Sequence, residues 1–358
     1  MSRFKKLKIK RIQRETPDSV VLTLDVPPEL REQFQFTQGQ YLTFRREHEG
    51  EELRRSYSIC SSPLEGEWQV AIKQVPQGRF SSLAVQNLRV GEELEVMPPA
   101  GHFHTPLHAT QAKHYLCFAA GSGITPVFSI IKTVLLTEPG SRVTLVYGNR
   151  GRNSIIFKEG IEGLKNRSLN RLSVYHVLSR EQGEADLLFG RIDEEKAALF
   201  LQKVVPADQV DECFICGPED MINGVRAALA AAGVAPEKIH FELFGSATAG
   251  ADKAARVAPP VGADDKKSVV TLRLDGSTRR LEMSYYGNTI LDEALESGAD
   301  APYSCKNGMC STCMARVTAG KVEMDVNYSL SEAEVAKGYV LTCQARPLTP
   351  EVTVDFDQ

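Results

Sequence analysis

The chain has 358 residues, too many for one ordinary hydrophobic core, so its length predicts two or three domains. Its net charge of −4 gives no electrostatic reason to expect nucleic-acid binding. No apolar run approaches the roughly 20 residues of a membrane helix, and the basic start lacks the apolar stretch of a secretory signal. We therefore expect no nucleic-acid or membrane partner, a cytoplasmic location and reduced thiols.

Residues 1–104 consist of short runs of alternating or β-branched residues, separated by proline and glycine. Runs of this length and spacing are typical of strands, and several in succession predict a barrel or sandwich. The predicted strands cover residues 19–27, 41–47, 53–61 and 68–75. We interpret the block as an antiparallel β-barrel domain.

Residues 105–245 follow a different pattern, in which apolar strands alternate with helices. The segment 124–136, "ITPVFSIIKTVLL", has helical spacing and follows the apolar run "HYLCFAAG". Further strands are predicted at 142–150, 171–179 and 211–218. Alternation of this kind predicts an α/β domain with a parallel sheet.

The remaining residues divide into a linker and a third domain. Residues 246–267 are rich in alanine, glycine, proline and charge, which predicts a flexible linker. Residues 268–358 predict a strand, a turn at "DGS", a second strand, a helix in "TILDEALESG", a cysteine-rich loop and a strand in "ARVTAGKV". The chain is thus expected to be a multidomain protein.

Four cysteines of the third domain follow the spacing Cys305-x4-Cys310-x2-Cys313, with Cys343 farther along. This spacing is the plant-type [2Fe–2S] pattern, in which four thiolates hold two irons. Gly308 lets the loop turn tightly around the cluster. Zinc is the alternative, although structural zinc sites usually combine two short cysteine pairs. Residues 268–358 resemble a plant-type ferredoxin, which implies an α+β β-grasp fold with these four cysteines as cluster ligands.

The barrel block carries two motifs that resemble those of the ferredoxin–NADP reductase superfamily. The first is Arg-x-Tyr-Ser, and the second, Gly-x-x-Ser, follows 20 residues later. The resemblance implies bound FAD, with FMN as the alternative. A permanent cation suits the flavin phosphate, a tyrosine ring can lie on the isoalloxazine, and a serine can bond near flavin N5. The residues concerned are Arg55, Ser56, Tyr57 and Ser58 in the first motif, and Gly78, Phe80 and Ser81 in the second, where amides and a hydroxyl would cradle the pyrophosphate.

The α/β block matches the same superfamily's nicotinamide motif, Gly-x-Gly-x-x-Pro, rather than the dehydrogenase fingerprint. Its residues are Gly121, Gly123, Thr125 and Pro126, and they are expected to open a helix whose N-terminus stabilises a pyrophosphate. The resemblance also implies that Cys216, Gly217 and Pro218 lie beside the nicotinamide and that Phe244 covers the flavin. Cys213 and Cys216 point to opposite faces of a strand, so we expect no shared metal or disulfide.

The end of the strand at 142–150 indicates which nicotinamide is used. No acidic residue follows it directly to bind a free ribose 2′-hydroxyl, whereas Asn149, Arg150 and Arg152 could receive a 2′-phosphate. We predict NADPH, with NADH as the alternative.

Taken end to end, the chain resembles the reductase components of bacterial oxygenases, with the order flavin, nucleotide, ferredoxin. Within this family, the segments "MDVNY" and "GYVLTCQA" of the chain resemble the reductase subunits of phenylacetyl-CoA epoxidases (ring 1,2-epoxidases). The resemblance implies electron transfer from NADPH through FAD and [2Fe–2S] to a multisubunit di-iron oxygenase complex of phenylacetate degradation. Alternatives are the same relay serving a steroid hydroxylase or a hybrid-cluster protein, and a cluster-based redox sensor.

Overall fold

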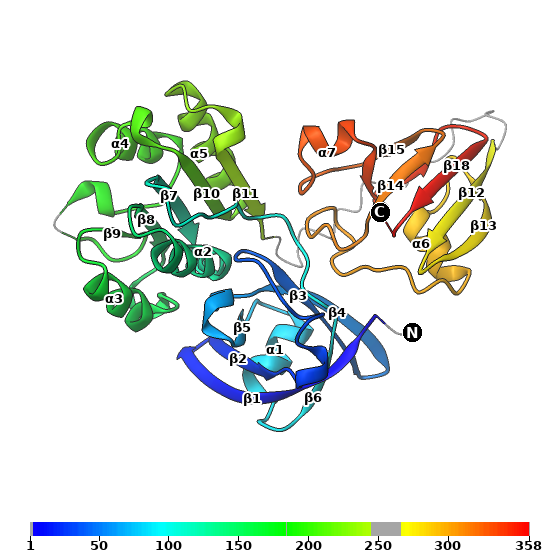
Figure 1. The fold of residues 1–358 in the computed structure, drawn as a ribbon, viewed down its shortest axis with the longest axis horizontal. Coiled ribbons are helices and arrows are strands. Elements are labelled where there is room, and N and C mark those ends of the chain that lie inside the picture. The colour runs from blue at the N-terminus through cyan, green and yellow to red at the C-terminus, as the bar shows by residue number, and fades with distance from the viewer. Residues whose placement is uncertain (1–2, 184, 245–265, 358) are drawn as a thin grey trace. The chain divides into compact units, whose positions relative to one another are not determined.

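The computed structural model describes residues 3–183, 185–244 and 266–357. The chain folds into two compact units, Met1–Phe244 and Gly245–Gln358 (Figure 1). The predicted linker at 246–267 lies outside the described residues, apart from its last two. Of these, Lys267 is already the first residue of a strand.

The first half of unit 1 is an antiparallel barrel, as predicted. Its sheet has the order β4-β3-β6-β1-β2-β5 in the described part of the chain, and a bridge between Ile59 and Val70 joins its two edges. Strand alternation explains the burial: in β1, Leu7 and Ile9 point into the core, while the alternating residues Lys6, Lys8 and Lys10 are exposed. The strands are β1 (Lys5–Thr16), β2 (Ser19–Asp25), β3 (Tyr41–His48), β4 (Glu51–Ser58), β5 (Trp68–Lys73) and β6 (Glu93–Val96).

A short helix, α1 (Arg79–Gln86), follows β5 and packs on the barrel. Its buried residues Phe80, Ala84 and Val85 join the barrel core together with Phe44. Two 3₁₀ turns, Pro28–Leu30 and Pro63–Glu65, lie in the barrel's connections.

The second half of unit 1 is a parallel sheet with the order β11-β10-β7-β8-β9, which confirms the predicted α/β domain. Cys117 of β7 belongs to the core cluster shared with α2 and α3, whereas the Phe118 ring packs against Phe200 of α4. Helices therefore cover both faces, as Figure 1 shows. The elements are β7 (His114–Ala120), α2 (Ile124–Thr137), β8 (Arg142–Asn149), α3 (Lys158–Arg167), β9 (Leu172–Leu178), α4 (Glu194–Lys203), β10 (Glu212–Gly217), α5 (Glu219–Ala231) and β11 (Ile239–Leu243). Further 3₁₀ turns span Gly121–Gly123, Arg152–Ser154, Asp186–Leu188, Ala207–Gln209 and Pro236–Lys238.

Unit 2 is an α+β domain. Within residues 266–357, one mixed sheet has the order β13-β12-β18-β14-β16, and β15 pairs with β17 beside it. The predicted turn at "DGS" is confirmed, since Asp275 and Gly276 have φ values of 52° and 70° between β12 and β13. The single strand predicted in "ARVTAGKV" is wrong: Gly320, with φ of 80°, divides it into β14 and β15. The elements are β12 (Lys267–Leu274), β13 (Ser277–Ser284), α6 (Ile290–Glu296), β14 (Met314–Ala319), β15 (Val322–Met324), α7 (Glu332–Ala336), β16 (Tyr339–Leu341), β17 (Ala345–Pro347) and β18 (Glu351–Asp355).

Among the described residues, no helix combines the length and apolar character that crossing a membrane requires.

Candidate functional site

The predicted flavin motif lies at the end of β4. Arg55 is exposed, Ser56 and Tyr57 are half-buried, and Ser58 is buried. The Tyr57 ring lies 5.6 Å from the Phe80 ring, centroid to centroid, which joins the two predicted flavin motifs in space. Burial raises the pKa of Tyr57 above its usual value, against the effect of the Arg55 charge. A neutral aromatic surface beside an exposed guanidinium fits a flavin and its phosphate.

The second flavin motif forms the turn into α1. The Ser81 hydroxyl donates to the Gly78 carbonyl at 3.1 Å and accepts from the Val75 N–H at 3.2 Å. Ser81 therefore shapes the turn with both of its hydrogen bonds. The first N–H groups of a helix have no partner within the helix, so the α1 N-terminus offers amide donors to a diphosphate. The backbone of this turn therefore fits a diphosphate, and the Ser81 hydroxyl holds that backbone in place.

The nicotinamide turn packs directly on the end of β10. A methyl group on Gly123 would lie 2.1 Å from the Cys216 carbonyl oxygen and 2.9 Å from the Gly217 nitrogen. Only glycine permits this approach, which brings the Gly-x-Gly-x-x-Pro turn beside Cys216-Gly217-Pro218. The helix begins after the glycines, at Ile124, with Pro126 in its first turn, and the Thr125 hydroxyl donates to the Ser122 carbonyl at 3.0 Å.

Glu242 is a site residue that sequence reasoning missed. It pairs in register with Cys216 across β10 and β11, and its carboxylate accepts a hydrogen bond from the Ser58 hydroxyl at 3.3 Å. Burial raises the pKa of Glu242 to about 8, although the Ser58 hydrogen bond acts in the other direction. Burial also raises the pKa of Cys216, with the Glu242 charge as a second cause. The available signal was a lone carboxylate within the apolar strand "HFEL".

Phe244 follows two residues after Glu242. Its ring is half-buried and packs against the core cluster of the parallel sheet. Cys213 is a fully buried free thiol, and burial raises its pKa, with Cys117 as a second cause.

Strand β8 ends at Asn149, which is buried, and the exposed Arg150 follows it at the start of the turn. No acidic residue follows this strand directly in the sequence. The fold nevertheless brings Glu181, from the connection after β9, to the turn. Its carboxylate accepts a hydrogen bond from the Arg152 N–H at 3.1 Å and lies 3.9 Å from the Arg152 guanidinium. One of the two predicted phosphate-binding arginines thus has a carboxylate partner.

The four cysteines of unit 2 meet as two pairs. The Cys305 N–H donates to the Cys310 sulfur at 3.5 Å, and the Cys310 side chain lowers the pKa of Cys305 against the effect of burial. Cys313 and Cys343 form the second pair, and the hydrogen bond from Cys313 lowers the pKa of Cys343. Within the described ranges, no group of three or more His, Cys, Asp or Glu side chains is arranged to hold a single metal ion. Two pairs fit two irons better than one tetrahedral zinc.

The loop around these pairs fits a cluster in other respects. The Asn307 N–H points at the Cys305 sulfur at 3.3 Å, and the Gln344 side chain donates to the Cys343 sulfur at 3.5 Å. Gly308 has φ of 74°, as its predicted tight turn requires. The Ser304 hydroxyl is buried without a hydrogen-bond partner among the described residues, which suits a group next to a bound cluster.

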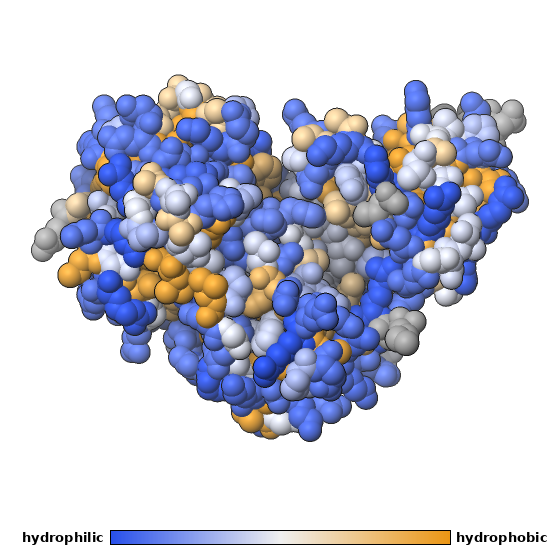
Figure 2. Space-filling model, viewed as in Figure 1, coloured by the Kyte–Doolittle hydropathy of each residue, from blue (hydrophilic) through white to orange (hydrophobic). Residues whose placement is uncertain are grey.

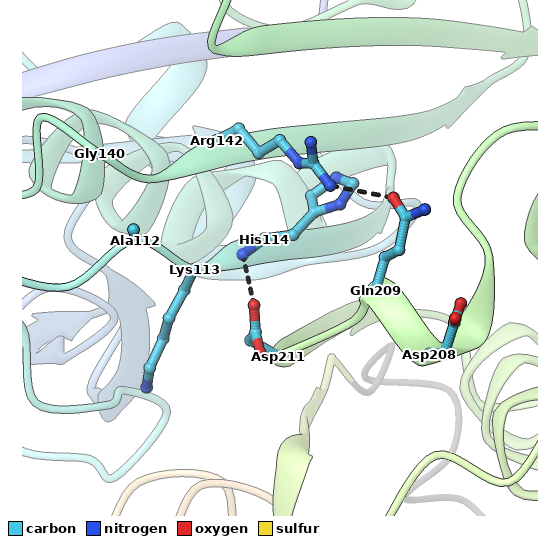
Figure 3. A pocket seen from close by; sticks show the side chains of 8 residues that line it. All are labelled: Ala112, Lys113, His114, Gly140, Arg142, Asp208, Gln209 and Asp211. Atoms are coloured by element: carbon cyan, nitrogen blue, oxygen red, sulfur yellow. Dashed lines mark hydrogen bonds between the residues drawn. The ribbon is translucent and has the colours of Figure 1, made fainter.

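A cavity of about 320 Å³ lies elsewhere, where β7 and β8 begin (Figure 3). Its lining includes His114, Arg142 and Asp211, and the His114 N–H donates to the Asp211 carboxylate at 2.8 Å. None of the predicted site residues lines it. In parallel sheets ligands bind at the opposite, carboxyl ends of the strands, where the nicotinamide turn lies.

Comparison with known families agrees with this arrangement. Residues 6–105 match the oxidoreductase FAD-binding domain, residues 118–227 the oxidoreductase NAD-binding domain, and residues 272–348 the 2Fe-2S iron-sulfur cluster binding domain. Phthalate dioxygenase reductase, a modular structure for electron transfer from pyridine nucleotides to [2Fe-2S], shares the fold. Its TM-score is 0.58 at 23% identity, covering 99% of this chain and 98% of that one.

Full-length relatives are more similar in sequence. A 1,2-phenylacetyl-CoA epoxidase subunit from Escherichia coli (strain K12) is 44% identical, covering 100% of this chain and 99% of its own length. The ferredoxin reductase component of 3-ketosteroid-9-alpha-monooxygenase from Rhodococcus rhodochrous is 36% identical, covering 98% of this chain and 96% of its own length. The chain therefore belongs, together with this epoxidase subunit, to the family of oxygenase reductases within the ferredoxin–NADP reductase superfamily that carry a C-terminal [2Fe–2S] ferredoxin domain.

Proposed function

We propose that this chain is the reductase of a phenylacetyl-CoA epoxidase and carries electrons from NADPH to the di-iron oxygenase of that complex. The observation that carries the proposal is the 44% identity to the Escherichia coli epoxidase subunit over the full chain, with all three cofactor motifs present. When bound, FAD would accept an electron pair from the nicotinamide and release single electrons, which the [2Fe–2S] cluster would relay.

The chain's own residues prepare the transfer from nicotinamide to flavin. Tyr57 offers a ring face for orientation, and the Ser58 hydroxyl is held by Glu242 at 3.3 Å. With a pKa of about 8, the Glu242 carboxyl keeps a proton near neutral pH. A protonated, half-buried carboxyl beside the reacting groups adds no negative charge that would repel them. Phe244 and Cys216 would close the site from the nucleotide side.

The preference for NADPH rests on the turn after β8. The exposed Arg150 guanidinium follows the buried Asn149, and an exposed guanidinium suits a 2′-phosphate through bidentate hydrogen bonds. Glu181 partly compensates the charge of Arg152, so Arg150 is the stronger determinant.

A steroid hydroxylase is the second candidate acceptor, because the ketosteroid monooxygenase reductase is 36% identical over nearly the whole chain. The identity of 44% favours the epoxidase. We also propose a cytoplasmic location, consistent with eight cysteines of which none forms a disulfide.

A coupled assay tests the acceptor. The purified chain is mixed with a phenylacetyl-CoA oxygenase complex, NADPH, O₂ and phenylacetyl-CoA, and the CoA ester is followed by mass. One added oxygen per NADPH consumed supports the epoxidase. NADPH loss without oxygenated product rejects it, and a parallel reaction with a 3-ketosteroid oxygenase tests the second candidate.

A further inference from the structure

Helix α2 meets the barrel through a set of polar side chains that the site described above does not use. We call this set the α2 seam, and it lies within unit 1. On the helix it contains Ser129, Lys132 and Thr133. On the barrel it contains Ser61, Ser62 and Glu65, at the 3₁₀ turn that follows β4.

Three hydrogen bonds cross the seam. The Ser129 hydroxyl donates to the Ser61 carbonyl at 2.6 Å, and the Thr133 hydroxyl bonds the Ser62 hydroxyl at 2.9 Å. The Lys132 ammonium donates to a Glu65 carboxylate oxygen at 2.6 Å. That oxygen also accepts from the Ser62 N–H at 2.7 Å, so the ion pair is fixed to the backbone of the turn.

The seam is buried. Ser61, Ser62 and Ser129 are fully inaccessible, and Thr133 and Lys132 are 3% and 9% exposed. The Lys132 ammonium also lies 4.8 Å from the centre of the Phe128 ring. Buried polar groups are costly unless each finds its partner, so only one placement of helix and turn satisfies them all. Apolar packing alone would not specify placement so narrowly, because it has no directionality.

The seam is also close in sequence to both halves of the proposed site. Ser61 lies three residues after Ser58 of the flavin strand. Ser129 lies three residues after Pro126 of the nicotinamide turn, one turn along the same helix. A shift at the seam is therefore transmitted to the two motifs through short, rigid stretches of backbone.

We propose that the α2 seam fixes the nicotinamide-binding turn relative to the flavin strand, and that Ser129, Lys132 and Thr133 are positioning residues for transfer between the two cofactors. This inference rests on the proposed function. Transfer between stacked rings depends steeply on their separation, and a misplacement of about 1 Å can cost about a hundredfold in rate. The seam acts on rate rather than on affinity, because none of its residues belongs to either binding motif.

The experiment uses the full chain with FAD and cluster bound. Variants T133V and K132M remove one seam contact each, while T133S and K132R keep the hydroxyl and the cation. Leu136→Ala, at an exposed position of the same helix, is the control. Each protein is assayed for FAD per chain, for NADP⁺ dissociation constant, for the long-wavelength absorbance of the stacked nicotinamide and flavin, and for the anaerobic single-turnover rate of flavin reduction.

We expect T133V and K132M to reduce flavin at least about tenfold more slowly and to lose the stacking absorbance. FAD content and NADP⁺ affinity should stay within about twofold, and T133S, K132R and L136A should resemble the unaltered protein. Unchanged rate and absorbance in T133V and K132M would overturn the proposal. So would parallel loss of FAD and nucleotide affinity, which indicates a merely structural seam. If neither nicotinamide reduces the flavin of the unaltered chain, it is the proposed function that fails.

Discussion

The Ser58 hydroxyl of the barrel lies 3.3 Å from the Glu242 carboxylate of the parallel sheet, although the two residues are 184 positions apart. This contact brings the end of the flavin strand to the last strand of the nucleotide domain. It also places the half-buried Glu242 carboxyl beside Cys216, because the two residues are in register across β10 and β11.

The first prediction concerns the proton on Glu242. Its pKa is about 8 in the folded chain and about 4.3 in an unfolded one, so between these values only the folded chain holds the proton. The stability from this group is complete below pH 4.3 and is lost as pH rises to 8, by at most about 1.4 kcal/mol per pH unit. In E242Q, which has no titrating carboxyl at this position, the free energy of unfolding should fall less over this pH range.

Unfolding of the FAD-free chain by urea at pH 6 and pH 8 provides the measurement. Trp68, the chain's only tryptophan, lies in β5, so its fluorescence reports on unit 1 alone. An E242Q protein that loses as much stability as the unaltered chain between these pH values would show that Glu242 is not the titrating group.

The second prediction concerns the cluster. Cys305→Ser removes one thiolate of the first cysteine pair, so we expect loss of the cluster's visible absorbance and at least about a hundredfold slower electron delivery to the oxygenase. Flavin reduction by NADPH should be unchanged, because the four cysteines lie in the other compact unit. Stopped-flow absorbance separates the two steps. Loss of flavin reduction as well would contradict this division of roles.

The third prediction concerns the choice of nicotinamide. Arg150→Glu replaces an exposed cation with an anion at the expected 2′-phosphate position. Steady-state KM for NADPH should rise at least about tenfold, the cost of roughly 1.4 kcal/mol, while KM for NADH changes little. An equal rise in KM for both nucleotides would show that Arg150 does not contact the 2′-phosphate.

The fourth prediction concerns the carboxylate that opposes Arg152. Glu181→Gln removes the charge that lies 3.9 Å from the Arg152 guanidinium but keeps a side chain of the same size. Exposed ion pairs contribute about 0.2–1 kcal/mol, so KM for NADPH should fall by up to about fivefold. NADH serves as the matched control, and a similar fall for NADH would show that the effect is not on the 2′-phosphate.

The fifth prediction concerns the close approach of Gly123. In Gly123→Ala the added methyl would overlap the Cys216 carbonyl oxygen, so the nicotinamide turn must move away from β10. We expect NADP⁺ affinity to fall at least about tenfold, with FAD retained. Isothermal titration measures the affinity.

Gly163→Ala is the matched control, because Gly163 lies within helix α3, where a methyl group meets only the Arg167 side chain at 3.9 Å. It should leave affinity unchanged and stabilise the helix slightly. Unchanged affinity in both variants would mean that the turn tolerates the displacement.

The sequence by itself determined the motifs whose residues are close together along the chain. The spacing of Cys305, Cys310 and Cys313, the Arg-x-Tyr-Ser strand and the Gly-x-Gly-x-x-Pro turn are local, because each cofactor is held by a short loop with fixed residue intervals. The strand and helix periods likewise predicted an antiparallel barrel and a parallel sheet, since burial of one face imposes those periods, whereas the α+β domain followed from the resemblance to a plant-type ferredoxin.

The tertiary structure alone decided the contacts between distant segments. Glu242 meets Ser58, Glu181 meets Arg152, and Ser129 meets Ser61 only because the sheets and α2 pack as they do. Apart from the lone carboxylate of Glu242 in its strand, these side chains look like ordinary surface or strand residues in the sequence, and none of them indicates its partner. A hydrogen bond across 68 or 184 residues leaves no local period or interval to read, because only the folded packing sets its geometry.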